Sequence, residues 1–244
     1  MSAFDTFVFM AAVISGAIAS LAGFGIGSVL TPLIAVQLGT KLAVAVVSFP
    51  HFAATLLRFL MIRQHLDSRV FVTFGVASAA GGLTGALLNA RFASAVLGYV
   101  LASLLVFAGI SGLFGISQRM RFEKTTGIVA GALSGLFGGL VGNQGGIRSA
   151  ALMGFNLEKQ AFVATATAVG LVVDLFRMPV YIGTQSTEIK AHAFLIAVAS
   201  AGVLIGTIFG KRLLQRIPDR TFRIVVYLLV LALGVSMFVN PAGK

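Results

Sequence analysis

The sequence predicts an all-α, polytopic integral membrane protein built from two inverted-topology repeats. Three observations support this prediction: an apolar composition, two glycine-rich interruptions inside long apolar stretches, and basic residues gathered in three loops. Hydrophobic residues make up 58% of the 244 positions and charged residues 10%, whereas a soluble domain has about 25% charged residues. The mean hydropathy is +1.01. We therefore expect most of the chain to lie in a lipid bilayer.

The composition also excludes several function classes. The chain has no cysteine, which excludes disulfides, thiolate metal sites and cysteine nucleophiles. The net charge of +11 does not predict nucleic-acid binding, because the Lys and Arg residues lie between apolar runs and form no basic stripe with interleaved aromatics. No Lys or Arg precedes the first apolar run, so we expect that run to stay in the protein rather than to be cleaved as a signal peptide.

About eight hydrophobic segments can be marked along the chain, since a helix needs about 20 apolar residues to cross the bilayer core. Two of them, 4–38 and 125–155, hold 35 and 31 residues and contain the glycine-rich interruptions. They are too long for one crossing and barely long enough for two, so we interpret each as a helical hairpin. Ordinary crossings are predicted near 42–62, 70–89, 95–116, 161–182, 191–210 and 222–239.

Loop charges determine the direction of each hairpin. Lys and Arg concentrate in loops 63–69, 119–124 and 211–223, which the positive-inside rule places in the cytoplasm. The last two loops are separated by the second interrupted stretch and two ordinary crossings, so that stretch must return to the side it left. By the same count the first hairpin starts and ends outside, as does the poorly charged loop 184–188.

Each half is thus a glycine-broken hairpin followed by three crossings, and the halves are inverted relative to each other. We expect one integral membrane domain made of a first repeat at 1–118 and a second at 119–244. A spacing of 117 aligns Gly25 with Gly142, and a spacing of 115 is an alternative upstream. Downstream, Arg58 falls opposite Arg177 when one or two residues are inserted. The competing explanation is that membrane helices resemble one another through Ala, Leu and Val alone.

The two interruptions, at 21–32 and 136–149, predict a shared binding site. Glycine and proline at membrane depth free backbone groups that lipid cannot satisfy, so such breaks survive only where they line a cavity. Matching breaks in the two halves of a transporter mark the site between them near the bilayer midplane. Short helices that start at these breaks aim backbone N–H groups into the cavity, which favours an anion. Glycine also allows the backbone to approach a compact ligand closely.

Arg148 is the candidate for the fixed positive charge. An arginine at the bilayer centre costs about 2.5 to 3.5 kcal/mol, and its planar fork suits an oxyanion. The alternative is a hairpin-end residue whose side chain extends to the cytoplasmic surface. The neutral polar candidates could equally cap their own hairpins. The predicted substrate-binding residues are Arg148, Asn143, Gln144, Ser149, Gly145, Gly146, Gly25, Gly27, Ser28 and Thr31.

Four further polar residues inside predicted crossings are candidates for coupling or gating. Asp174 precedes Arg177 by three residues on one helical face, which permits an internal ion pair and, as an alternative, a proton-coupling acid. His51 follows Pro50 and could carry a proton, contact the anion or bond to a backbone carbonyl. Arg58 lies near the first basic loop and could extend to the membrane surface.

We find no pattern that predicts an enzyme, a metal site or a cofactor. His51, His65 and His192 are far apart in sequence and lack metal-ligand spacing, and no Ser-His-acid arrangement is visible. The glycines at 23–27 form no dinucleotide fingerprint, because no strand precedes them and no βαβ unit surrounds them. A phosphate-binding loop for ATP is also absent from the sequence.

The first break, GFGIGSVLTP, its counterpart GLVGNQGGIRSAAL and the overall length resemble the TauE/SafE family of sulfite and organosulfonate transporters. The resemblance covers nearly the whole chain. Two departures concern the substrate more than the fold: Gly27-Ser28 stands where the family usually has a denser glycine cluster, and Arg148-Ser149 stands where it has proline. The resemblance implies export of a small sulfur oxyanion such as sulfite, or of a sulfonate, coupled to an ion gradient.

The predicted function is therefore that of a secondary transporter, working as an exporter of small sulfur-containing anions by alternating access. The expected location is the inner or plasma membrane, with no cofactor and no nucleic-acid partner, and a homodimer is compatible with the sequence. Two alternatives stay open. One is a passive anion channel, and the other is a membrane scaffold or assembly protein without transport.

Overall fold

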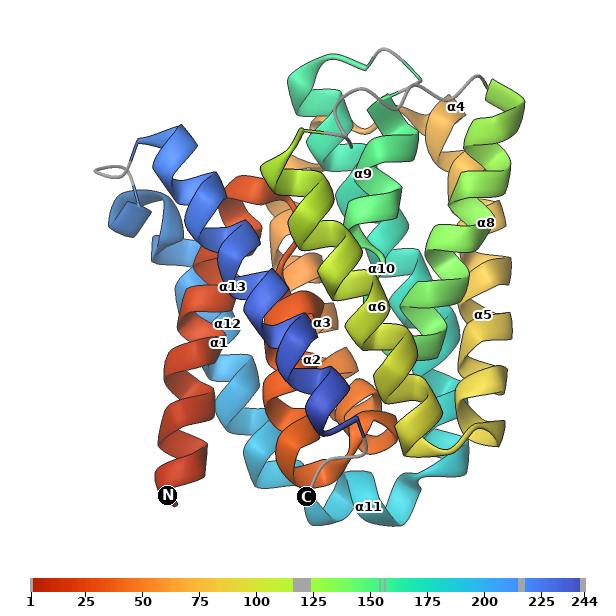
Figure 1. Ribbon diagram of the computed structural model, residues 1–244. Coiled ribbons are helices and arrows are strands. Elements are labelled where there is room, and N and C mark those ends of the chain that lie inside the picture. Colours follow the sequence, from red (N-terminus) through yellow and green to blue (C-terminus); the bar gives the residue numbers. More distant parts are fainter. Residues whose placement is uncertain (1, 116–123, 154, 156, 215–217, 242–244) are drawn as a thin grey trace.

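The computed structural model describes residues 2–115, 124–153, 155, 157–214 and 218–241, and these ranges are helical and contain no strand. Long helices pack side by side in one bundle (Figure 1). The helices are α1 Ala3–Ala22, α2 Ile26–Leu38, α3 Thr40–Ile62, α4 Ser68–Val70, α5 Val76–Arg91, α6 Ser94–Leu113, α8 Lys124–Val141, α9 Gly145–Met153, α10 Lys159–Thr184, α11 Ser186–Ala191, α12 Ala193–Leu214 and α13 Asp219–Val239.

Seven helical segments of this described part are long and apolar enough to cross a membrane. They include all six ordinary crossings predicted from the sequence, together with α1. Large apolar side chains such as Phe7, Val76 and Phe209 are exposed on the outside of the bundle, where a lipid-facing surface needs them. The chain is thus a multi-pass, all-α membrane protein, as its composition predicts.

The third crossing is less regular than predicted. After a 3-10 turn at Arg63–His65, Asp67 caps α4 by accepting the backbone N–H of Val70 at 2.9 Å. The helix then passes through a π-helical turn, Phe71–Gly75, before α5 begins. The crossing therefore runs from Ser68 to Arg91, slightly beyond the predicted 70–89 at both ends.

Each interrupted stretch folds into a long helix followed by a short one. α1 and α8 have 20 and 18 residues, whereas α2 and α9 have 13 and 9. At 1.5 Å per residue, α1 is about 30 Å long, enough for a crossing, but α9 is only about 14 Å long. Gly23 and Gly142 end the long helices with left-handed φ values of 79° and 74°. Their N–H groups bond to the carbonyls of Ala19 and Gly138, which caps both helices in the same way.

From the breaks through the first crossing that follows each of them, the two halves are related by a spacing of 119 residues, not 117. This spacing separates Gly23 from Gly142, and it also separates the starts of α2 and α9 and the starts of α3 and α10. The prediction that Gly25 lies opposite Gly142 is therefore wrong, because the left-handed glycine that ends each long helix sets the register. Arg58 and Arg177 are also 119 apart, so no insertion is needed between the break and these arginines.

Helix packing follows the same relation between the halves. α1 packs on α12, and its counterpart α8 packs on α5, the counterpart of α12. Both pairs come close through glycine: a Cβ on Gly16 would lie 2.3 Å from the Val203 carbonyl oxygen, and one on Gly81 would lie 2.0 Å from that of Ala132. α3 packs on α10 and α6 on α13, so each of these pairs joins a helix to its own counterpart.

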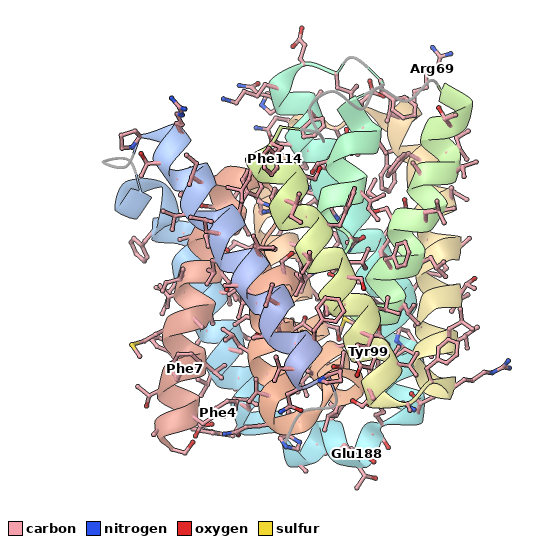
Figure 2. All side chains as sticks on the ribbon, in the orientation of Figure 1. Phe4, Phe7, Arg69, Tyr99, Phe114 and Glu188 are labelled. Carbon is pink, nitrogen blue, oxygen red and sulfur yellow. The ribbon has the colours of Figure 1, made fainter. Side chains whose placement is uncertain are left out.

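The hairpins open toward opposite ends of the bundle. The start of α1 and helix α11 lie at the lower end in Figure 1, whereas α4, the start of α8 and the end of α12 lie at the upper end. Figure 2 shows Arg69 at the upper end and Glu188 at the lower end. Loops 63–69 and 184–188 are thus on opposite sides, as the hairpin count requires. Most of loop 119–124 and the predicted repeat boundary at 118/119 lie outside the described residues, and the boundary stays a prediction.

Candidate functional site

The two glycine breaks meet inside the bundle. Gly27, in the first turn of α2, approaches the second break so closely that a Cβ on it would lie 2.1 Å from the Gly142 carbonyl oxygen. A small cavity lies at this meeting point, and one side chain from α3 completes its wall. Its lining residues are Phe24, Gly25, Gly27, Ser28, His51, Gly142, Asn143, Gln144, Gly145 and Arg148.

A hydrogen bond joins the two breaks across the cavity. The Ser28 hydroxyl donates to Asn143 Oδ1 at 3.0 Å, and both residues are buried. The amide oxygen of Asn143 accepts this bond, so the NH2 group of the same amide is available to donate to a ligand. The pair therefore fixes one hairpin against the other and leaves donors at the cavity wall.

Gln144 has a fixed backbone and a free side chain. Its carbonyl accepts the Ser134 hydroxyl and the Arg148 N–H, both at 3.0 Å. The side chain is 3% exposed, and among the described residues neither Nε2 nor Oε1 has a hydrogen-bond partner. A buried polar group without a partner costs about 1–3 kcal/mol, so this amide favours a ligand that bonds to it.

Arg148 is the fourth residue of α9, and its side chain is 2% exposed. This burial contradicts a side chain that extends to the membrane surface. Its Nη2 lies 3.5 Å from the Gly23 carbonyl oxygen, while Nε and Nη1 have no hydrogen-bond partner among the described residues. The guanidinium lies against Gly170 of α10, where a Cβ would be 2.6 Å from Nη1. No described carboxylate forms an ion pair with it.

A chain of buried ionisable groups starts at the cavity wall. His51 Nδ1 lies 2.6 Å from Asp174 Oδ2, and Asp174 Oδ1 lies 2.8 Å from Arg177 Nη2. The ion pair predicted from the spacing of Asp174 and Arg177 is thus confirmed. His51 is bonded to this carboxylate, not to a backbone carbonyl, which leaves its Nε2 for the cavity. The Arg177 and Tyr181 side chains donate to the carbonyls of Gly138 and Gly139 near the end of α8.

With this geometry established, comparison with known protein families gives a direct match. A family model described as "Sulfite exporter TauE/SafE" matches residues 8–237, which include both breaks and both hairpins. The chain belongs to the TauE/SafE family. Searches of curated proteins and of solved structures each gave no match. Membership confirms the family predicted from the two break motifs and establishes the chain as a member of a family of membrane transporters.

Not every predicted site residue of this TauE/SafE chain lines the cavity. Eight residues singled out from the sequence do, and they come from both breaks and from α3. Ser149 and Gly146 lie beside the cavity in α9 but are not part of its wall, and Thr31 is buried one turn further along α2. Asp174 and Arg177 reach the cavity only through His51, and Arg58 donates instead to the Ala19 carbonyl.

Two wall residues were not among the predicted site residues. Phe24 and Gly142 both belong to the breaks themselves. Phe24 packs so tightly that a Cβ on Gly145 would lie 2.3 Å from the Phe24 Cβ. Its position between Gly23 and Gly25 is the signal in the sequence, but an apolar side chain is not a ligand for an anion. Among the described residues, no group of three or more His, Asp or Glu side chains is placed to hold a metal ion.

Proposed function

We propose that this TauE/SafE protein is a secondary transporter that exports small sulfur oxyanions, such as sulfite or an organosulfonate, across the inner or plasma membrane. The anion binds in the cavity between the two breaks. The observation that supports this most strongly is Arg148, a buried cation at the cavity wall with two nitrogen atoms that have no partner among the described residues. A buried charge is costly unless it is paired, and a bound oxyanion supplies the pair.

The other wall groups suit the same ligand. The short helices α2 and α9 both begin at the cavity, with Gly27 in the first turn of α2 and Gly145 as the first residue of α9. The first backbone N–H groups of a helix have no partner within it, so each start offers donors and a partial positive charge. The amides of Asn143 and Gln144 add neutral donors. This donor-rich wall, with no carboxylate in it, fits an oxyanion.

The inverted hairpins support alternating access. Each opens toward a different end of the bundle, and the site lies where they meet. Tilting one hairpin relative to the other would expose the anion to one side at a time. A passive channel instead needs a continuous path for the anion across the membrane. A scaffold or assembly protein needs no anion-binding site.

His51 is the residue that we propose couples transport to protons. It touches the cavity with one side of its ring and Asp174 with the other, and the charged groups that act on it are Asp174, Arg177 and Arg148. A proton on His51 is stabilised by Asp174 and adds positive charge to the cavity wall. Proton binding and anion binding therefore strengthen each other, as reciprocal linkage requires. The proton then moves in the same direction as the anion, so the outward gradient of the anion drives export, and an imposed proton gradient drives accumulation on the side to which it points.

The test is flux of sulfite into proteoliposomes with and without an imposed pH gradient. We expect accumulation driven by the gradient, loss of accumulation in Arg148→Ala, and downhill flux that no longer responds to the gradient in His51→Gln. Arg220→Ala is the matched control, because Arg220 is exposed at the start of α13. Rapid downhill flux without accumulation would favour a channel, and absence of flux in the wild-type protein would favour a scaffold.

A further inference from the structure

Arg58 and Arg177 are counterparts in the two halves and make the same backbone contact. Arg177 Nη1 donates to the Gly138 carbonyl, and Arg58 Nη1 donates to the Ala19 carbonyl. Ala19 and Gly138 are themselves 119 residues apart, so the donor arginines and the acceptor carbonyls are related by the same spacing. Each arginine thus gives a second donor to the carbonyl that already accepts the capping N–H of Gly23 or Gly142, at the negative end of the long hairpin helix.

Among the residues that the structure describes, only one of the two arginines has an acid beside it. Asp174 precedes Arg177 by three residues and binds its guanidinium. The residue in the same position before Arg58 is Thr55, which is neutral. Arg58 is 8% exposed, and neither its Nε nor the Thr55 hydroxyl has a hydrogen-bond partner among the described residues. The first half therefore buries a positive charge that the second half would neutralise.

The unpaired charge of Arg58 lies close to Arg148. Arg58 donates to the Ala19 carbonyl in the last turn of α1, and Arg148 Nη2 lies 3.5 Å from the carbonyl of Gly23, the residue that ends this helix. The two guanidiniums therefore both contact backbone carbonyls at the C-terminal end of α1. Two like charges at the same helix end repel each other.

The buried charges around the cavity do not balance. Within the described residues, the buried charged side chains are Arg58, Arg148, Arg177 and Asp174, which leaves two positive charges in excess when His51 is neutral. A protonated His51 would raise the excess. The partial negative charge of one helix end, about half an elementary charge, is too small to cancel it. Arginine does not lose its proton in proteins, so the compensating charge has to come from a ligand.

We propose that the cavity binds a doubly charged oxyanion, and that Arg58 is the residue that sets this preference through its electric field rather than by contact. The first charge of the anion pairs with Arg148 at the wall, and the second is stabilised by Arg58 behind it. This inference rests on the proposed anion site and narrows its substrate class: dianions such as sulfite in its fully deprotonated form bind in preference to singly charged sulfonates.

The test compares anions of similar shape and different charge on the full-length protein. Calorimetry gives the Kd of sulfate, sulfite and methanesulfonate. Sulfite is measured at alkaline pH, where it is a dianion. Methanesulfonate is singly charged, because a methyl group replaces one oxygen of sulfate. We expect the wild-type protein to bind at least one dianion about tenfold or more tightly than methanesulfonate, the ratio for one extra charge within about 10 Å of a partly buried cation.

Variants at Thr55 test the role of Arg58 without removing it. Thr55→Asp gives Arg58 an acid three residues earlier, as Asp174 does for Arg177, and should weaken dianion binding by about tenfold while changing methanesulfonate binding much less. Thr55→Asn introduces a side chain with the shape of aspartate but without its charge. It is the matched control and should keep the wild-type ratio of dianion affinity to methanesulfonate affinity. Arg58→Gln should act like Thr55→Asp, and Arg58→Lys should restore part of the preference.

Each outcome decides something. Methanesulfonate binding as tightly as both dianions in the wild-type protein would overturn the charge preference and leave the anion site standing. Equal weakening of all anions in Thr55→Asp would overturn the assignment of that preference to Arg58. Equal weakening would mean that Arg58 has only a structural role. If the wild-type protein binds none of the three anions, the proposed function itself fails, and the inference fails with it.

Discussion

Arg177 in α10 and Arg58 in α3 occupy equivalent positions, donate to equivalent carbonyls and are both buried. Within the described part of the chain, however, only Arg177 has a carboxylate partner. The same contrast holds for the breaks. The first provides glycines and Ser28, whereas the second provides Asn143, Gln144 and Arg148.

The backbone of the two halves is therefore repeated, whereas the charged and polar side chains are not. The fold repeats because each half needs the same capped hairpin, the same glycine contacts and the same support for the end of the long helix. The polar side chains do not repeat, which agrees with the proposed anion site, because one compact ligand needs one set of donors. The site is therefore built on a symmetric scaffold with asymmetric chemistry, and the following predictions test each part.

The largest expected effect comes from removing the acid that the second half has and the first half lacks. Asp174→Asn leaves Arg177 buried without a charged partner, which should lower the free energy of unfolding by about 3–5 kcal/mol. Denaturant unfolding in detergent measures this. Thr55→Asn, at the equivalent position of the first half, should change stability by much less. Equal effects at the two positions would mean that the ion pair contributes nothing to the difference between the halves.

A smaller effect is expected from the glycine contact between the breaks. In Gly27→Ala the new Cβ meets the Gly142 carbonyl at 2.1 Å, and the hairpins must move apart at a cost of about 1–3 kcal/mol. Gly146→Ala is the matched control, because Gly146 is the counterpart of Gly27 at a spacing of 119 and has open space around its Cβ position. Thermal unfolding should separate the two variants. A stable Gly27→Ala protein would show that the breaks do not touch.

The smallest effect should come from crowding Arg148 without removing it. Gly170→Ala places a Cβ 2.6 Å from Nη1, but the far end of an arginine can shift, so we expect anion affinity to fall by about tenfold with little change in stability. Gly183→Ala on the same helix meets no atom within 4 Å and serves as control. Binding calorimetry measures the difference. Unchanged sulfite affinity in Gly170→Ala would place the guanidinium elsewhere.

Sequence analysis predicted the fold in detail because hydropathy, glycine breaks and loop charges each report a membrane constraint directly. It identified the six ordinary crossings, the two hairpins and the pairing of Asp174 with Arg177. It missed the register by two residues, because several closely spaced glycines fit more than one alignment and only the left-handed conformation of Gly23 and Gly142 distinguishes them.

The candidate site was predicted only in part. Polar residues in the breaks were found because such residues at membrane depth need a reason. The contact of His51 with Asp174 joins residues 123 positions apart, and no local pattern encodes such a pairing. The absence of an acid beside Arg58 also became meaningful only after the 119-residue relation placed Thr55 opposite Asp174.

The central claim is that the two breaks form one anion site with Arg148 as its fixed charge. The most direct measurement is calorimetric titration of sulfite into the purified wild-type protein and into Arg148→Ala, with Arg148→Lys as the variant that keeps the charge but loses the planar fork. We predict that sulfite binds the wild-type protein, that affinity falls by about a hundredfold or more in Arg148→Ala, and that Arg148→Lys lies between them. Sulfite binding with the same affinity to a folded Arg148→Ala protein would contradict the account.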